Sequence, residues 1–175
     1  MTPEDSTAHD TIETIDGRPA VRLQRTLAHP VQRVWRAVSD PAELERWFPA
    51  AADWTPTEGE TFEAYGTTGE VTEVDAPHRL AWTFATDTYR FDLRAEGDGC
   101  RLKFTHGFDD RDRAAQTAAG WDAYLSRLPP HLDGGHLSEQ DAHRPWDAVH
   151  ELYAARFGVD PAPGRAFIAA QRDAT

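Results

Sequence analysis

The chain has few cysteines, few lysines and no long apolar run, and each of these excludes a class of protein. Cys100 is the only cysteine, so neither an internal disulfide nor a multi-cysteine zinc site is expected. No stretch approaches the ~20 apolar residues of a membrane-spanning helix, and the N-terminus lacks the apolar core of a signal peptide. The sequence therefore predicts a cytoplasmic protein with no membrane partner.

Positive charge is also scarce, because the net charge is −12 and Lys103 is the only lysine. An acidic surface repels phosphate backbones, so nucleic acid is not an expected partner. The chain also lacks a phosphate-binding glycine loop, since Gly97-Asp98-Gly99 has the pattern of a hairpin turn. We therefore expect the acidity to serve solubility.

Residues 25–48 predict a strand followed by two short helices. Asp40 is a good N-cap for the second helix, Pro41 suits its first position, and Glu43 is placed to close a capping box. Apolar residues at helical spacing give each helix one buried face. These residues are Val31, Val34, Trp35 and Val38 in the first helix, and Leu44, Trp47 and Phe48 in the second.

Alternating apolar residues predict a first strand or a hairpin over residues 11–27 and five more strands between residues 60 and 107. One-sided alternation of this kind is typical of an antiparallel sheet with one covered face. The clearest examples are Phe62 and Ala64, Val71 and Val74, Leu80, Trp82 and Phe84, Tyr89, Phe91 and Leu93, and Leu102, Phe104 and His106.

Helices are expected after the strands. Residues 111–128 predict a long amphipathic helix that covers the sheet and ends at Pro129. Residues 145–157 predict another, capped by Gly158. Its stripe, Trp146, Val149, Tyr153 and Phe157, must be buried. We expect it either to fold back and close one end of a cavity, or to form a homodimer interface; the chain is thus a monomer or a homodimer.

Several separated motifs over residues 20–133 carry a resemblance to a known family. They are Val34-Trp35-Arg36-Ala37, Asp40-Pro41, Arg46-Trp47-Phe48, the segment from Gly69 to Leu80, the segment from Leu102 to Phe108, and the segment from Gly120 to Leu125. The chain resembles the START-like (SRPBCC, helix-grip) superfamily, in the branch of the heat-shock-protein-90 ATPase activator homologues.

The resemblance implies an α+β helix-grip fold. A curved antiparallel sheet of six or seven strands would wrap around a long C-terminal helix, with two short helices after the first strand. We expect residues 1–10 to form a disordered leader, residues 11–133 the domain, and residues 134–175 a helical extension. The extension would pack on the domain or at an interface.

The superfamily places its ligand cavity between the sheet and the long helix. The residues that alternation and helical spacing direct there are Trp82, Phe84, Phe91, Leu93, Phe104, His106, Trp121, Tyr124 and Leu125. The alternative interpretation is a solid core without a cavity. His106 and Tyr124 are the polar candidates for orienting a ligand, although structural hydrogen bonds are the favoured interpretation of both.

Three functions remain open at this point. The first is non-catalytic binding of a small hydrophobic molecule, without a cofactor. The second is a co-chaperone-like interaction with a protein partner. The third, an enzyme such as a polyketide cyclase or hydrolase, is less expected because few acid–base groups point inward. No metal site is expected, because His136, His143 and His150 are spaced too widely along a helix to share an ion.

Overall fold

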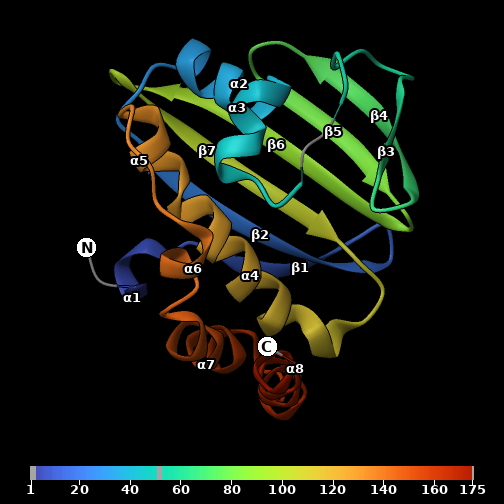
Figure 1. Cartoon of the computed structure of the whole chain (residues 1–175), viewed down its shortest axis with the longest axis vertical. Coiled ribbons are helices and arrows are strands. Elements are labelled where there is room, and N and C mark those ends of the chain that lie inside the picture. Colours follow the sequence, from blue (N-terminus) through green and yellow to red (C-terminus); the bar gives the residue numbers. More distant parts are fainter. Residues whose placement is uncertain (1–2, 51–52, 175) are drawn as a thin grey trace.

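A curved antiparallel sheet is the main layer of the fold (Figure 1). The computed structural model describes residues 3–50 and 53–174. The strands of the sheet lie in the order β1-β2-β7-β6-β5-β4-β3. They are β1 (Thr11–Ile15), β2 (Arg18–Leu27), β3 (Thr61–Ala64), β4 (Thr67–Asp75), β5 (Arg79–Phe84), β6 (Asp87–Glu96) and β7 (Gly99–Gly107). Residues 11–27 form a hairpin, which is one of the two predicted alternatives, and the five further strands are confirmed.

One face of the sheet is buried, as the alternation predicts. Leu80, Phe91, Phe104 and Leu23 are register partners across β5, β6, β7 and β2. All four are fully buried. Their row forms the floor of the apolar core, and the intervening polar residues lie on the opposite face.

Two short helices, α2 (Val31–Ser39) and α3 (Pro41–Trp47), cover one end of this face (Figure 1). The Asp40 side chain accepts a hydrogen bond from the Ala42 amide, so the predicted N-cap is present. The expected capping box is not formed. Glu43 instead accepts hydrogen bonds from Arg33 and His131, at 2.7 and 2.8 Å, because these cationic and imidazole donors lie within reach.

The long helix α4 (Ala114–Ser126) follows a 3-10 turn at Arg111–Arg113 and crosses the concave side of the sheet. A further helix, α5 (Leu128–Leu132), begins directly after it. Pro129 and Pro130 lie in the first turn of α5, where a missing N–H costs nothing. The predicted end of α4 is therefore also the start of another helix.

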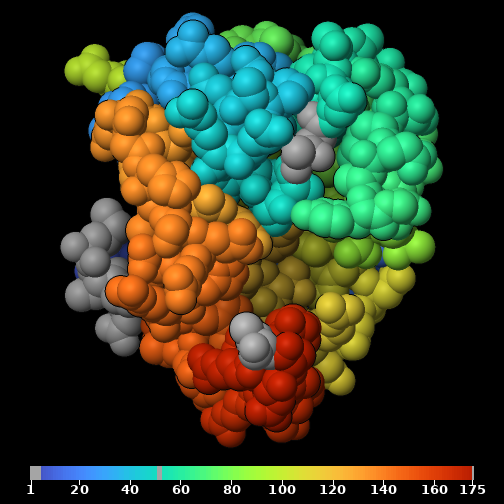
Figure 2. Space-filling view, viewed as in Figure 1, coloured from blue at the N-terminus to red at the C-terminus, as the bar shows by residue number. Residues whose placement is uncertain are grey.

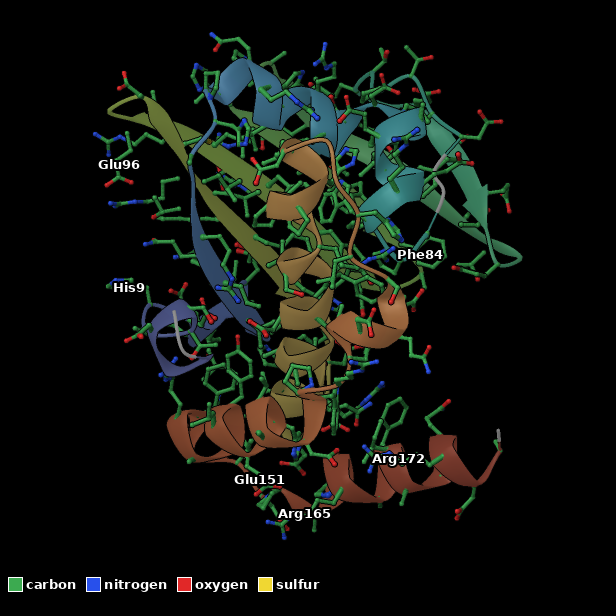
Figure 3. All side chains as sticks on the ribbon, turned by 60° about the vertical axis from the view of Figure 1, so that its left-hand side comes forward. His9, Phe84, Glu96, Glu151, Arg165 and Arg172 are labelled. Atoms are coloured by element: carbon green, nitrogen blue, oxygen red, sulfur yellow. The ribbon has the colours of Figure 1, made fainter. Side chains whose placement is uncertain are left out.

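The C-terminal segment contains α6 (Glu139–Ala142), α7 (Trp146–Phe157) and α8 (Ala162–Asp173). The stripe of α7 is buried, and the helix ends at Gly158, whose φ is 63°. It packs against α4 within the same chain and also contacts β1. Ion pairs join α8 to α7, with Arg165 on Glu151 and Arg172 on Asp147 (Figure 3).

Residues 3–10 are the described part of the segment that the sequence predicts to be a disordered leader. They include the short helix α1 (Pro3–Ser6) and the buried residue Asp10. Asp10 accepts hydrogen bonds from the backbone N–H of Gln24, from the Arg25 guanidinium and from the Tyr153 hydroxyl. A carboxylate with this many donors fixes the chain around it. Residues 1–2 of the expected leader and residue 175 of the expected extension lie outside the described residues.

Candidate functional site

A hollow of about 160 Å³ lies between the sheet, α4 and the segment that follows α3. Figure 2 shows the surface hollowed between the cyan segment after α3, the green β3–β4 hairpin and the golden α4. Eight of its eleven described lining residues are aromatic, and none of these eleven is charged. We call it the aromatic cavity. Its lining is Phe48, Pro49, Ala50, Trp54, Phe62, Ala64, Tyr65, Trp82, Phe84, Tyr89 and Trp121.

Four further hollows are larger, at about 310, 370, 420 and 600 Å³, and the two largest of these have a different chemistry. One, of about 420 Å³, is on the outer face of the sheet, among Arg18, Arg22 and Arg90. The other, of about 600 Å³, lies beside α1 and is lined by polar residues such as Arg25 and Asp122. Small-molecule sites are concave and mainly apolar, so the aromatic cavity is the candidate site despite its smaller volume.

Strand register builds one side of the aromatic cavity. Trp82, Tyr89 and His106 are partners in β5, β6 and β7, so their rings form a row across the sheet. The ring centroids of Trp82 and Tyr89 are 5.4 Å apart, and those of Tyr89 and His106 are 4.4 Å apart, with both pairs stacked. Stacked rings in adjacent strands hold one another in place.

The opposite side comes from α3 and α4. Phe48 ends α3, and its ring centroid lies 5.4 Å from Trp121 on α4 and 6.1 Å from Trp82. The ring centroids of Trp54 and Trp82 are 5.5 Å apart. The indole nitrogen of Trp54 donates a hydrogen bond of 3.1 Å to the Ser39 carbonyl, which holds the ring in place. Large rings meeting from three elements explain why a gap remains between them.

Tyr65 marks the edge of the aromatic cavity. It lies in the β3–β4 turn with a φ of 50°, followed by Gly66 with a φ of 72°. Positive φ is uncommon for tyrosine and turns its side chain over the edge of the hairpin. Its hydroxyl donates a hydrogen bond of 2.8 Å to the Pro49 carbonyl, although the residue is 80% exposed. This bond links the hairpin to the segment after α3.

His106 lies behind the cavity rather than in its lining. Its Nδ1 accepts a hydrogen bond of 2.9 Å from the indole nitrogen of Trp121. Because an indole N–H only donates, Nε2 carries the imidazole proton and donates to Asp87 at 2.8 Å. Burial alone would raise the pKa of Asp87, but the hydrogen bond from His106 helps to hold the pKa below its usual range. His106 thus orients Trp121.

The structure brings only part of the predicted set together. Trp82, Phe84 and Trp121 line the aromatic cavity. Trp121 is half-buried rather than fully buried, because one side of its ring faces the hollow. The other predicted residues that point toward this layer, Phe91, Leu93 and Phe104, are buried in the packed core beneath it.

Tyr124 and Leu125 lie away from the aromatic cavity. The Tyr124 hydroxyl donates to Glu139 of α6. Leu125 is buried and borders the hollow beside α1. The reason is that α4 is covered on two sides, by the sheet and by α7, so its large residues do not all face the sheet.

Eight lining residues were not predicted as site residues. Alternation with Phe91 and Leu93 was a signal for Tyr89, and alternation within β3 was one for Phe62 and Ala64. The segment after α3 has no periodicity that would have placed Pro49, Ala50 or Trp54. Among the described residues, no group of three or more histidine, cysteine, aspartate or glutamate residues is placed to hold a metal ion.

The fold and the cavity define a helix-grip protein, and comparison with known families agrees. The family model described as Activator of Hsp90 ATPase homolog 1-like protein matches residues 28–133. This is more than half of the chain, so the chain belongs to that family. A search of curated proteins found no significant match. No helix in residues 3–50 or 53–174 is long and apolar enough to span a membrane.

Solved structures with the same fold include three that are informative. CalU16 from Micromonospora echinospora is 24% identical, with a TM-score of 0.70 over 83% of this chain and 94% of CalU16. DynU16, a protein in the dynemicin biosynthetic locus, is 26% identical, with a TM-score of 0.58 over 65% of this chain and 47% of DynU16. The Aha1 dimer from Colwellia psychrerythraea is 16% identical, with a TM-score of 0.57 over 65% of this chain and 95% of that one.

Proposed function

We propose that the protein binds a small apolar molecule in the aromatic cavity. The observation that carries this proposal is the lining itself: eight aromatic residues and three small ones surround about 160 Å³. Transferring an apolar ligand from water to such a lining is favourable at about 25 cal/mol per Å² of apolar area removed from water. The strand rows and the Trp121–His106 hydrogen bond keep the cavity formed before a ligand arrives.

The volume limits the size of the ligand. Sites for drug-sized molecules usually enclose about 300–1,000 Å³. A dry apolar cavity of about 150 Å³, engineered into another protein, binds benzene. A volume of about 160 Å³ therefore suits a molecule built on a single ring rather than a long-chain or polycyclic compound.

The described lining contains no acid–base pair. It has no carboxylate, imidazole, thiol or amine, and both ring nitrogens of His106 are engaged by Trp121 and Asp87. Catalysis of the cyclase or hydrolase kind needs converging acid and base groups at the reacting atoms. Binding without chemistry is the function that this lining supports best.

Titration with toluene, followed by calorimetry, tests the proposal. We expect saturable binding to one site in the native protein. Ala64→Leu should abolish it, because the added atoms fill a large part of the cavity. Thr61→Leu is the matched control, since residue 61 is on the same strand but exposed. Absence of saturable binding, or equal binding by the two variants, would refute the proposal.

A protein partner is the second candidate, favoured by the family match. The description of the matching family concerns activators of the Hsp90 ATPase, and the solved Aha1 structure from Colwellia psychrerythraea is a dimer. The test is the ATPase rate of purified Hsp90 with and without this protein. A dose-dependent rise that persists in Ala64→Leu would favour the partner role, and an unchanged rate would leave ligand binding as the function.

A further inference from the structure

Five described lining residues of the aromatic cavity have a polar side-chain hydrogen to donate: Trp54, Trp82, Trp121, Tyr65 and Tyr89. Three of these donors are already used within the protein. Trp54, Trp121 and Tyr65 donate, in that order, to the Ser39 carbonyl, His106 Nδ1 and the Pro49 carbonyl, at 3.1, 2.9 and 2.8 Å. Most of the side-chain donors in the described lining are thus not available to a ligand.

Two donors are left: the Trp82 indole N–H, which can only donate, and the Tyr89 hydroxyl, which can also accept a hydrogen bond. The Tyr89 hydroxyl has no hydrogen-bond partner among residues 3–50 and 53–174, although its ring is fixed by stacking on Trp82 and His106. The oxygen is also accessible. The unpartnered and fully inaccessible side-chain atoms of the described chain are on Arg18, Glu60 and His150, and Tyr89 is not among them. Burial raises the pKa of Tyr89, so its hydroxyl stays protonated at neutral pH.

We propose that Tyr89 orients the ligand through a hydrogen bond, and that the ligand is a single aromatic ring carrying a hydroxyl group. This inference rests on the proposed function. The ring suits a cavity whose sides are themselves aromatic, and whose volume holds about one ring. The hydroxyl group follows from Tyr89, because an apolar ligand would leave this half-buried hydroxyl without a partner. Sites built around such a hydrogen bond discriminate against analogues that lack it.

The matched ligands phenol and toluene test this inference, since they have the same shape and differ in a hydroxyl against a methyl group. Calorimetric dissociation constants are measured for both ligands on the native protein and on Tyr89→Phe. Comparing the ratio of the two constants between the proteins cancels the different hydration of the ligands. We expect Tyr89→Phe to weaken the binding of phenol relative to toluene. The ratio of the phenol dissociation constant to the toluene dissociation constant should therefore rise about three- to tenfold. Toluene binding should change less than twofold.

Tyr124→Phe is the control, because its hydroxyl is bonded to Glu139 outside the cavity. It should leave the ratio unchanged. An unchanged ratio in Tyr89→Phe would overturn the role of Tyr89 while toluene binding keeps the proposed function standing. If neither ligand binds the native protein, the proposed function fails as well. A melting curve of each variant shows that the fold is retained.

Discussion

The indole nitrogen of Trp121 donates a hydrogen bond to Nδ1 of His106, across the interface between α4 and the sheet. Asp87 holds the other ring nitrogen of this imidazole. The long helix is thus joined to the sheet by a directed polar contact as well as by apolar packing. This contact sets the position of the Trp121 ring, which forms one side of the aromatic cavity.

Trp121→Phe should remove this contact and destabilise the protein by about 1–2 kcal/mol, because the imidazole nitrogen of the buried His106 loses its donor. In a denaturant-based double-mutant cycle with His106→Phe, we expect a coupling energy of about 1 kcal/mol. Trp35→Phe, combined with the same His106 variant, is the additive control, since no hydrogen bond joins Trp35 to His106. Strict additivity in the Trp121 cycle would show that the contact contributes nothing.

Tyr65→Phe should loosen the edge of the cavity. The lost hydrogen bond to the Pro49 carbonyl is solvent-exposed, so stability should fall by less than about 1 kcal/mol. The ligand should nevertheless exchange several times faster, because the β3–β4 hairpin is no longer tied to the segment after α3. NMR line shapes of bound toluene measure this rate. An unchanged rate would mean that ligands enter elsewhere.

Glu43 gives the protein an acid-sensitive clamp between α2, α3 and α5. Burial alone would raise its pKa, but hydrogen bonds from Arg33 and His131 outweigh this and lower the pKa below its usual range. The carboxylate therefore stabilises the fold above the unfolded pKa of about 4.3, and this contribution is lost as the pH falls through the lower folded pKa.

We accordingly expect Glu43→Gln to be less stable than the native protein at pH 7 by about 1–2 kcal/mol. The difference should shrink steadily below about pH 4. Urea melts at a series of pH values measure it. A difference that is the same at pH 7 and pH 3 would contradict the role of the Glu43 charge.

Shortening the chain to end at Gly134 removes α7, and with it the buried stripe and the Tyr153–Asp10 hydrogen bond. Because α7 covers α4 within the same chain, we expect a monomer whose melting temperature falls by more than 10 °C, or a protein that does not fold. A chain ending at Val159 is the control, since α8 is mostly exposed. A native dimer that becomes a stable monomer would instead indicate an interface.

Much of the fold follows from the sequence because its signals are local. Alternation located β5, β6 and β7, and helical spacing with Asp40 and Pro41 located α2 and α3. The buried network around Asp10 was not predictable, since its partners Arg25 and Tyr153 are far away in sequence. A polar N-terminal segment gives no sign that one of its carboxylates will be buried.

The site was predicted less completely, for a physical reason. Strand alternation correctly brought Trp82 and Phe84 to the cavity, because a sheet has only two faces. A helix covered on two sides gives no such rule, so Tyr124 and Leu125 were placed on the wrong side of α4. A cavity is also the space that the packed side chains do not fill, so its position depends on how the elements pack together. Strand alternation alone therefore does not reveal that Phe91 lies beneath the cavity while Tyr89 borders it.

The tryptophans provide a direct test of whether a ring-sized apolar molecule enters the aromatic cavity. Trp54, Trp82 and Trp121 line the cavity, whereas Trp35 and Trp146 do not. In ¹⁵N-labelled protein titrated with toluene, we predict saturable shifts of the first three indole signals and unchanged signals from the other two. Indole signals that all stay still, or that all move alike without saturation, would contradict the account.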